Sequence, residues 1–187
     1  CMDPPGTALQ VSAGTRHSCV LRSGGAVECW GGSGSEPGEI AVPPNVYSQV
    51  SAGSQYTWAV AQDGELVWWG VVDDEFQVPN AVYEQVSAIV WTACAVRESG
   101  RIDCWMPQYY PYNEGQAFPP DGDFVQVSMG EYFACAVRDD ASVECWGAFA
   151  GGLVSLPDGE FERVSAGGAH ACGLRPGGRI ECWGCQH

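Results

Sequence analysis

The feature that most constrains this chain is a unit repeated five times, built around two positions ten residues apart. In four copies both positions are cysteines and the second is followed by tryptophan: Cys19 with Cys29 and Trp30, Cys94 with Cys104 and Trp105, Cys135 with Cys145 and Trp146, and Cys172 with Cys182 and Trp183. The remaining copy has Trp58, Trp68 and Trp69 at these positions. Self-similarity with a period of about 20–50 residues indicates a repeat architecture, in which each unit buries its apolar faces against its neighbours.

A second repeated element, close to Val-Ser-Ala-Gly, precedes each pair and marks the period. It begins at Val11, Val50, Val86, Val127 and Val164. We therefore predict one domain, residues 1–187, with repeats of about 37 residues starting near 8, 47, 83, 124 and 161.

The ten-residue spacing is typical of a β-hairpin. If Cys19 lies opposite Cys29, residues 23–25 form a three-residue loop, and the same register places glycine third in four of the five loops. That position needs a left-handed residue in a type I turn followed by a bulge. Because side chains alternate along a strand, this register also assigns each residue to a face.

The two faces of the predicted hairpin differ in chemistry. One carries the disulfide among apolar residues, such as Leu21 and Val27. On the other, each final Trp lies opposite a small residue, and an arginine lies diagonal to an acid. The predicted ion pairs are Arg22 with Glu28, Arg97 with Asp103, Arg138 with Glu144, and Arg175 with Glu181. The tryptophan copy has Ala61 and Val67 there, so it lacks both partners together, as expected for a partly buried pair.

Cysteine usage and charge restrict the compartment and the partners. Ten cysteines at matched spacings form a disulfide framework in an oxidising compartment, and zinc sites usually use closer pairs. We expect an extracellular or cell-surface protein. The net charge of −15, with no lysine, excludes nucleic acid and anionic membranes as partners, and no apolar run is long enough for membrane insertion.

An all-β repeat with Pro-containing connections, each suited to an edge strand, predicts a five-bladed β-propeller. Residues 1–7 align with the outer part of a blade and are expected to complete the last one. Cys1 and Cys185 are left over after the four hairpins, and we predict that they bond and close the ring. Two alternatives use Cys182 with Cys185, either as a redox pair or, with His187, as a metal site. We expect no metal.

The segments Val-Ser-Ala-Gly, His-Ser-Cys-Val-Leu and Val-Glu-Cys-Trp-Gly resemble the repeats of the regulator of chromosome condensation family, in the short, cysteine-rich form found in extracellular proteins. The resemblance covers nearly the whole chain. It implies a β-propeller that recognises proteins through loops on its faces. It does not imply nucleotide exchange, because the family's regulator has seven blades and longer repeats.

Candidate binding residues lie in variable loops, which carry function more often than regular elements do. One group is a tyrosine cluster, and the other follows each Val-Ser-Ala-Gly element and would form a ring on one face of the propeller. The first comprises Tyr109, Tyr110 and Tyr112, and the second comprises Arg16, Gln55, Trp91 and Tyr132. His17 and His170 occupy equivalent repeat positions and are interpreted as packing residues.

No catalytic constellation is present in the sequence, and no cofactor is expected. We predict a non-enzymatic secreted or surface module for protein recognition or assembly. The alternatives are a subunit of an extracellular homopolymer or filament, which would self-associate through the same loops, and a carbohydrate-binding lectin. The protein partner, a second copy and a glycan are thus the three classes of partner to distinguish.

Overall fold

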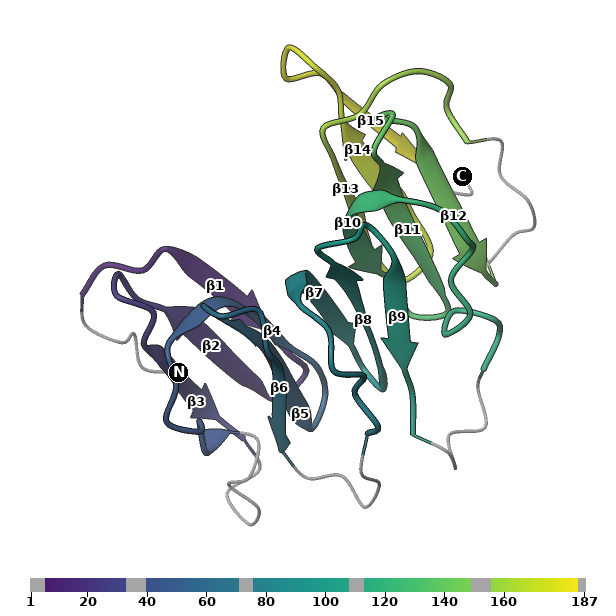
Figure 1. Cartoon of the computed structure of the whole chain (residues 1–187). Coiled ribbons are helices and arrows are strands. Elements are labelled where there is room, and N and C mark those ends of the chain that lie inside the picture. Colours follow the sequence, from purple (N-terminus) through teal and green to yellow (C-terminus); the bar gives the residue numbers. More distant parts are fainter. Residues whose placement is uncertain (1–5, 33–39, 71–75, 108–112, 149–155, 185–187) are drawn as a thin grey trace.

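The computed structural model describes residues 6–32, 40–70, 76–107, 113–148 and 156–184, and within them the fold is all-β. Fifteen strands form five antiparallel sheets of three, each made of strands consecutive in the chain (Figure 1). The strands are β1 (Gln10–Ala13), β2 (His17–Leu21) and β3 (Val27–Gly31); β4 (Tyr47–Ala52), β5 (Tyr56–Ala61) and β6 (Leu66–Gly70); β7 (Tyr83–Ile89), β8 (Thr92–Arg97) and β9 (Ile102–Trp105); β10 (Phe124–Met129), β11 (Phe133–Arg138) and β12 (Val143–Gly147); β13 (Arg163–Ala166), β14 (Ala171–Leu174) and β15 (Ile180–Trp183).

Each sheet is one repeat, and we call it a blade. The described residues of the Pro-containing connections form no strand, although an edge strand was expected there. Proline has no N–H to donate to a sheet, which is consistent with this outcome. Each blade therefore has three described strands.

The five blades follow one another as an open arc (Figure 1). Each blade packs on the next in chain order, but in the described part of the chain the first and last blades lie at opposite ends of the arc. The closed ring that the repeats predict is thus not seen between these strands. Cys1 and Cys185 lie outside the described residues, so their bond stays a prediction.

The predicted hairpin register is confirmed. Cys19 lies opposite Cys29, and Trp58 lies opposite Trp68 in the copy without cysteines. All four hairpin disulfides are present: Cys19 to Cys29, Cys94 to Cys104, Cys135 to Cys145, and Cys172 to Cys182.

The left-handed loop position is confirmed as well. The third loop residue has a φ of 83° at Gly25 and 85° at Gly64, Gly100 and Gly178. The exception in residue type is Ala141, which adopts the same conformation with a φ of 67°.

The core lies between blades. The disulfide face of one blade packs on the next blade's first strand and final Trp, so Cys19 and Leu21 share a buried cluster with Tyr47, Val50 and Trp69. The same arrangement recurs at the other three interfaces. In each, the aromatic residue at or just before the start of the incoming first strand is at most 2% exposed: Tyr47, Tyr83, Phe124 and Phe161.

The predicted ion pairs lie beside the hairpin loops of four of the five blades, and all four are confirmed. Arg97 binds Asp103 through Nε at 2.6 Å and Nη2 at 2.9 Å, and Asp103 also accepts a hydrogen bond from Tyr83 at 2.7 Å. Arg138 and Arg175 instead stack on the rings of Phe124 and Phe161. In the last three blades the ion pairs therefore contact the aromatic residue at or just before the start of the first strand.

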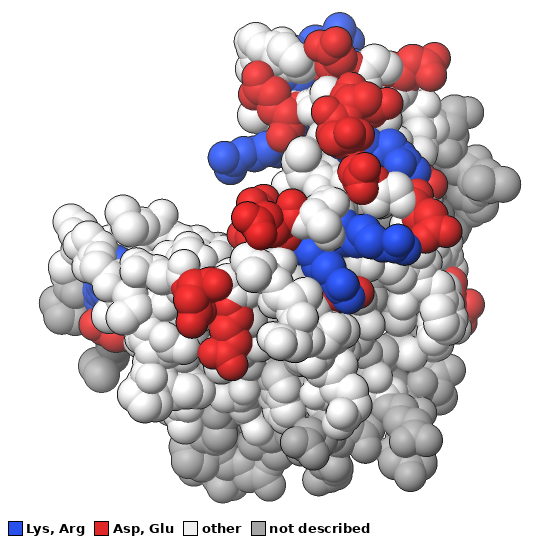
Figure 2. Space-filling view, viewed as in Figure 1, with Lys and Arg blue, Asp and Glu red and all other residues white. Residues whose placement is uncertain are grey.

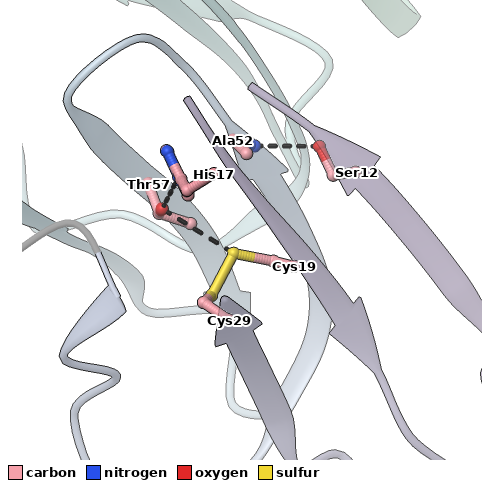
Figure 3. The surroundings of a disulfide bond; sticks show 6 residues. All are labelled: Ser12, His17, Cys19, Cys29, Ala52 and Thr57. Atoms are coloured by element: carbon pink, nitrogen blue, oxygen red, sulfur yellow. Dashed lines mark hydrogen bonds between the residues drawn. A yellow bond between two sulfur atoms is a disulfide. The ribbon is translucent and has the colours of Figure 1, made fainter. Parts of the chain in front are cut away.

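Side chains also connect the first strands of successive blades. The Gln10 amide accepts a hydrogen bond from Val50 N at 3.1 Å and donates one to Val50 O at 3.0 Å. Two residues further on, Ser12 Oγ accepts a hydrogen bond from Ala52 N at 2.9 Å (Figure 3). The equivalent Gln and Ser side chains accept the same backbone hydrogen bonds at the next three interfaces. Gln85 and Gln126 also donate a hydrogen bond to the next first strand. They satisfy backbone groups on an edge strand that would otherwise be left unpaired. We call this series the Gln-Ser ladder.

Candidate interaction surfaces

The turn between the first two strands of each blade carries four of the predicted binding residues. Backbone hydrogen bonds join neighbouring turns, from Thr15 N to Gly53 O at 3.0 Å and from Ser54 N to Val90 O at 3.2 Å. They hold Arg16, Gln55 and Trp91 in three adjacent turns. Tyr132 occupies the corresponding turn of the fourth blade. We call these four residues the turn surface.

The members of the turn surface differ in what they offer a partner. Arg16 is exposed, whereas Gln55, Trp91 and Tyr132 are half-buried. Trp91 packs on Tyr56 with ring centroids 6.5 Å apart, so part of its ring serves the blade itself. The turn surface combines a cation, an amide and two aromatic rings, and this mixture suits recognition of a protein surface. The four side chains differ from one blade to the next.

The two histidines stand in different environments. His17 is buried at the first blade interface, where Nε2 lies 2.7 Å from Thr57 Oγ1 (Figure 3). The same hydroxyl lies 3.9 Å from Cys19 Sγ. His170, in the last blade, is exposed. The geometry of His17 is that of an interface residue, as its repeat position predicts.

Several predicted site residues lie outside the described residues. They are Tyr109, Tyr110, Tyr112, Cys1, Cys185 and His187. Cys182 is bonded to Cys172, which leaves it no thiolate for the redox or metal alternatives. Within the described ranges, no group of three or more His, Cys, Asp or Glu side chains is placed to hold a metal ion. The same ranges contain no helix long and apolar enough to cross a membrane.

Charge is distributed unevenly over the arc. Figure 2 shows acidic and basic side chains gathered over the fourth and fifth blades, whereas few lie over the first three in that view. On the face seen in Figure 2, the two ends of the arc therefore differ in the density of charged side chains.

The end faces of the arc are surfaces that the sequence analysis missed. Val11 is 68% exposed, whereas the equivalent Val50, Val86, Val127 and Val164 are at most 4% exposed. At the other end Ile180 is 67% exposed, although the equivalent Leu66 and Ile102 are buried. One signal was available: glutamine precedes the Val-Ser pair in the first four copies, and Arg163 replaces it in the fifth.

The comparisons with known proteins agree with this architecture. The family model of the regulator of chromosome condensation (RCC1) repeat matches residues 9–35. No curated protein sequence matches the chain.

Solved structures resemble the chain over nearly its full length. The CRINKLY WD40 ectodomain of the Arabidopsis thaliana receptor kinase ACR4 is 26% identical with a TM-score of 0.74, over 95% of this chain and 63% of that one. The ectodomain of the Physcomitrella patens receptor kinase CR4 is also 26% identical, with a TM-score of 0.75, over 92% of this chain and 52% of that one. Prp20p of Saccharomyces cerevisiae is 14% identical with a TM-score of 0.67, over 100% of this chain and 58% of that one.

These likenesses define the class: the five sheets are blades of the propeller type. The segment that the family model matches is the first of five equivalent units, so the repeats of this chain resemble RCC1 repeats. It spans between about half and two thirds of the length of these structures.

Proposed function

We propose that this protein is a non-enzymatic, extracellular module that binds a protein partner through the turn surface. The observation that carries the proposal is the pairing of a rigid frame with non-repeating side chains. Three blade interfaces and the hairpins beneath them bring Arg16, Gln55, Trp91 and Tyr132 to equivalent positions in successive turns. Preorganised side chains bind with less loss of conformational freedom.

Four further observations support this proposal. Four disulfides suit an oxidising compartment, and two similar structures are receptor-kinase ectodomains. The structure of Prp20p is described together with its binding to Gsp1p and histones, both proteins. The turn residues differ from blade to blade, which disfavours a sugar site repeated in every blade.

The test is capture of cell-surface and secreted proteins by the intact chain, with chemical cross-linking and identification by mass spectrometry. The double variant Arg16→Ala with Gln55→Ala alters the turn surface. A matched control, Gln62→Ala with Glu98→Ala, alters two exposed hairpin loops, which lie at the opposite end of the second and third blades from their turns. We expect one partner to be retained by the wild type and the control and lost by the turn variant.

Equal capture by all three proteins, or no captured protein, would contradict the proposal. Sizing the wild type over a range of concentrations and applying it to a glycan array separate the alternatives. Self-association that the turn variant abolishes supports the homopolymer, and binding to one sugar class supports the lectin.

A further inference from the structure

The interface between the second and third blades differs in chemistry from the other internal interfaces. At the first, third and fourth interfaces the buried cluster contains cysteine, whereas the described residues of the cluster at the second interface include none. Trp58 and Trp68 lie opposite each other in β5 and β6, where the other blades carry a disulfide. No bond in this packed surface therefore changes when the disulfides are reduced.

Aromatic rings from both blades fill the second interface. Trp58 is 0% exposed, and its ring stacks on that of Trp105 in the third blade with centroids 5.1 Å apart. The ring centroid of Phe76 lies 5.2 Å from that of Trp58 and 5.1 Å from that of Trp68. Aromatic pairs of this kind stabilise a fold beyond the effect of the area they bury. We call six rings of this cluster the aromatic interface: Tyr56, Trp58, Trp68, Phe76, Tyr83 and Trp105.

The aromatic interface also positions half of the turn surface. The Tyr56 hydroxyl donates a hydrogen bond to Ile89 O at 3.2 Å, which joins the second blade to the first strand of the third. Gln55 directly precedes Tyr56, and Trp91 packs on the Tyr56 ring. Two of the four turn residues are thus held in adjacent turns by contacts that involve no cysteine.

At the other internal interfaces a disulfide belongs to the packed surface. Cys19 is 0% exposed, shares a cluster with Tyr47, and its Sγ lies 3.9 Å from Thr57 Oγ1 of the second blade (Figure 3). Reduction by a dithiol breaks the bond from Cys19 to Cys29 and leaves two thiols, while the dithiol forms a disulfide, so two electrons and two protons are transferred. The hairpin then loses the cross-link that restricts its unfolded state, and its blade opens more readily.

The placement of the disulfides decides which turn residues depend on them. Arg16 belongs to the first blade and Tyr132 to the fourth, and the described interfaces beside these two blades all contain a disulfide. The third blade has a disulfide as well, but Cys94 lies on the face that packs on the fourth blade. The opposite face of the third blade, with Tyr83 and Trp105, packs on the second blade. Reduction therefore leaves the contact between the second and third blades unaltered.

We propose that the turn surface is redox-sensitive in two halves. In the reduced chain the aromatic interface still holds Gln55 and Trp91 in adjacent turns, whereas Arg16 and Tyr132 lose their fixed positions. With the disulfides formed, all four residues stand in one frame. The effect of reduction on partner binding rests on the function proposed above, but the effect on the blades does not.

Hydrogen exchange of the full chain, measured by NMR, tests the proposal at one equivalent amide per interface. A glutamine of the preceding blade binds each of these amides, which belong to Val50, Val86, Val127 and Val164. Exchange is compared between the oxidised chain and the chain held in dithiothreitol until mass spectrometry shows all four hairpin bonds reduced. We expect reduction to speed exchange little at Val86 and about tenfold or more at the other three amides, because exchange reports the opening of each interface.

Removal of a single disulfide gives the same test without a reductant. The double variant Cys19→Ala with Cys29→Ala lacks the bond of the first blade and keeps the other three. We expect faster exchange at Val50, whose interface contains this bond, and unchanged exchange at Val86 one interface further along the arc.

A tryptophan-to-cysteine exchange tests the aromatic interface itself. Trp58→Cys with Trp68→Cys gives the second blade the opposed cysteine pair that the other blades have. We expect Val86 in this variant to become as sensitive to reduction as the other three amides. Phe76→Ala gives the same readout in a chain that keeps both tryptophans, because it removes one ring of the aromatic interface and leaves the hairpin unchanged.

Partner binding gives a separate readout. With a partner identified by the capture described above, we expect Arg16→Ala to weaken binding by the oxidised chain and not by the reduced chain, and Trp91→Ala to weaken both. Failure to capture any partner would contradict the proposed function, and the exchange rates would still decide the present proposal. Equal acceleration at the four valine amides on reduction, or acceleration at none of them, would overturn it.

Discussion

Ala141 adopts a positive φ in a loop where the other four blades have glycine, and among the described residues it is the only non-glycine to do so. A side chain in the left-handed region costs about 1–2 kcal/mol through the contact of Cβ with the backbone. Its backbone nevertheless makes the contacts of the other loops, accepting a hydrogen bond from Phe161 N at 2.8 Å. The contact with Phe161 therefore holds Ala141 in a conformation that alanine by itself disfavours.

Replacement of Ala141 by glycine should therefore stabilise the protein. We expect a gain of about 0.5–1 kcal/mol in the free energy of unfolding, because relief of strain exceeds the added flexibility of the unfolded chain. Urea unfolding measures this change. The reverse substitution in the second blade, Gly64→Ala, should destabilise, since a Cβ there would collide with Val82. A loss of stability in Ala141→Gly would contradict the account.

Tyr83 links a blade's first strand to its ion pair. Burial raises the pKa of Tyr83 well above its ordinary value of 10.0, and the hydrogen bond to Asp103 adds to the increase. Because the pKa of Tyr83 is higher in the folded than in the unfolded chain, the contribution of its protonated hydroxyl to the free energy of unfolding is fully present below pH 10. This contribution is lost as the pH rises further, since the unfolded chain loses the proton first. We expect the free energy of unfolding to fall more steeply above pH 10 in the wild type than in Tyr83→Phe. Equal slopes would show that Tyr83 titrates as in the unfolded chain.

At the level of the elements, the hairpins follow from the sequence and the contacts between blades do not. The alternation of side chains and the paired cysteines fix each register, because a slip of one residue would separate Cys19 from Cys29. The Gln-Ser ladder joins residues about 40 positions apart, such as Gln10 and Val50. Nothing in the local pattern of a strand specifies a partner on the next blade. The repeat of glutamine before Val-Ser acquires meaning only once the blades are placed side by side.

The ladder should contribute to stability at each interface. Substituting Gln126 by methionine keeps the length of the side chain and removes both hydrogen bonds to Val164, which is 4% exposed. We expect a loss of about 1–3 kcal/mol, the cost of leaving buried backbone groups unpaired. Gln62→Met, in an exposed loop, is the control and should change stability little. A loss of the same size in the control would show that the Gln-Ser ladder does not account for the effect of Gln126→Met.

The disulfides should differ in their resistance to reduction. Cys19, Cys94 and Cys135 are 0% exposed, whereas Cys182 is exposed and Cys172 is half-buried. Because thiol-disulfide exchange requires access to a sulfur atom, dithiothreitol under native conditions should reduce the Cys172 to Cys182 bond first. Alkylation with mass spectrometry identifies the released cysteines. First release of Cys94 and Cys104 would contradict this order.

At the level of the whole molecule, the repeats predict the blades but not whether they close. Closure depends on the fit between the first strand of the first blade and the disulfide face of the last blade. In a regular repeat these two faces carry the same residue types as every interface between blades, so the repeat pattern alone does not show whether they meet. The positions that distinguish them are few: Ala8 replaces an aromatic residue in the first blade, and Arg163 replaces a glutamine in the last. The turn residues were predictable as a group, because they follow each Val-Ser-Ala-Gly element. Their adjacency depends on backbone contacts between blades that no single repeat encodes.

In the part of the chain that the structure describes, five propeller-type blades form an open arc whose two end faces have no neighbouring blade. Amide hydrogen exchange tests it with an internal reference, because the amides of Val50, Val86, Val127 and Val164 are bound by the preceding blade's glutamine. Val11 holds the equivalent position in the first blade and is 68% exposed. The open arc predicts that the Val11 amide exchanges far faster than the other four. Protection of Val11 equal to theirs would show a closed ring and contradict the account.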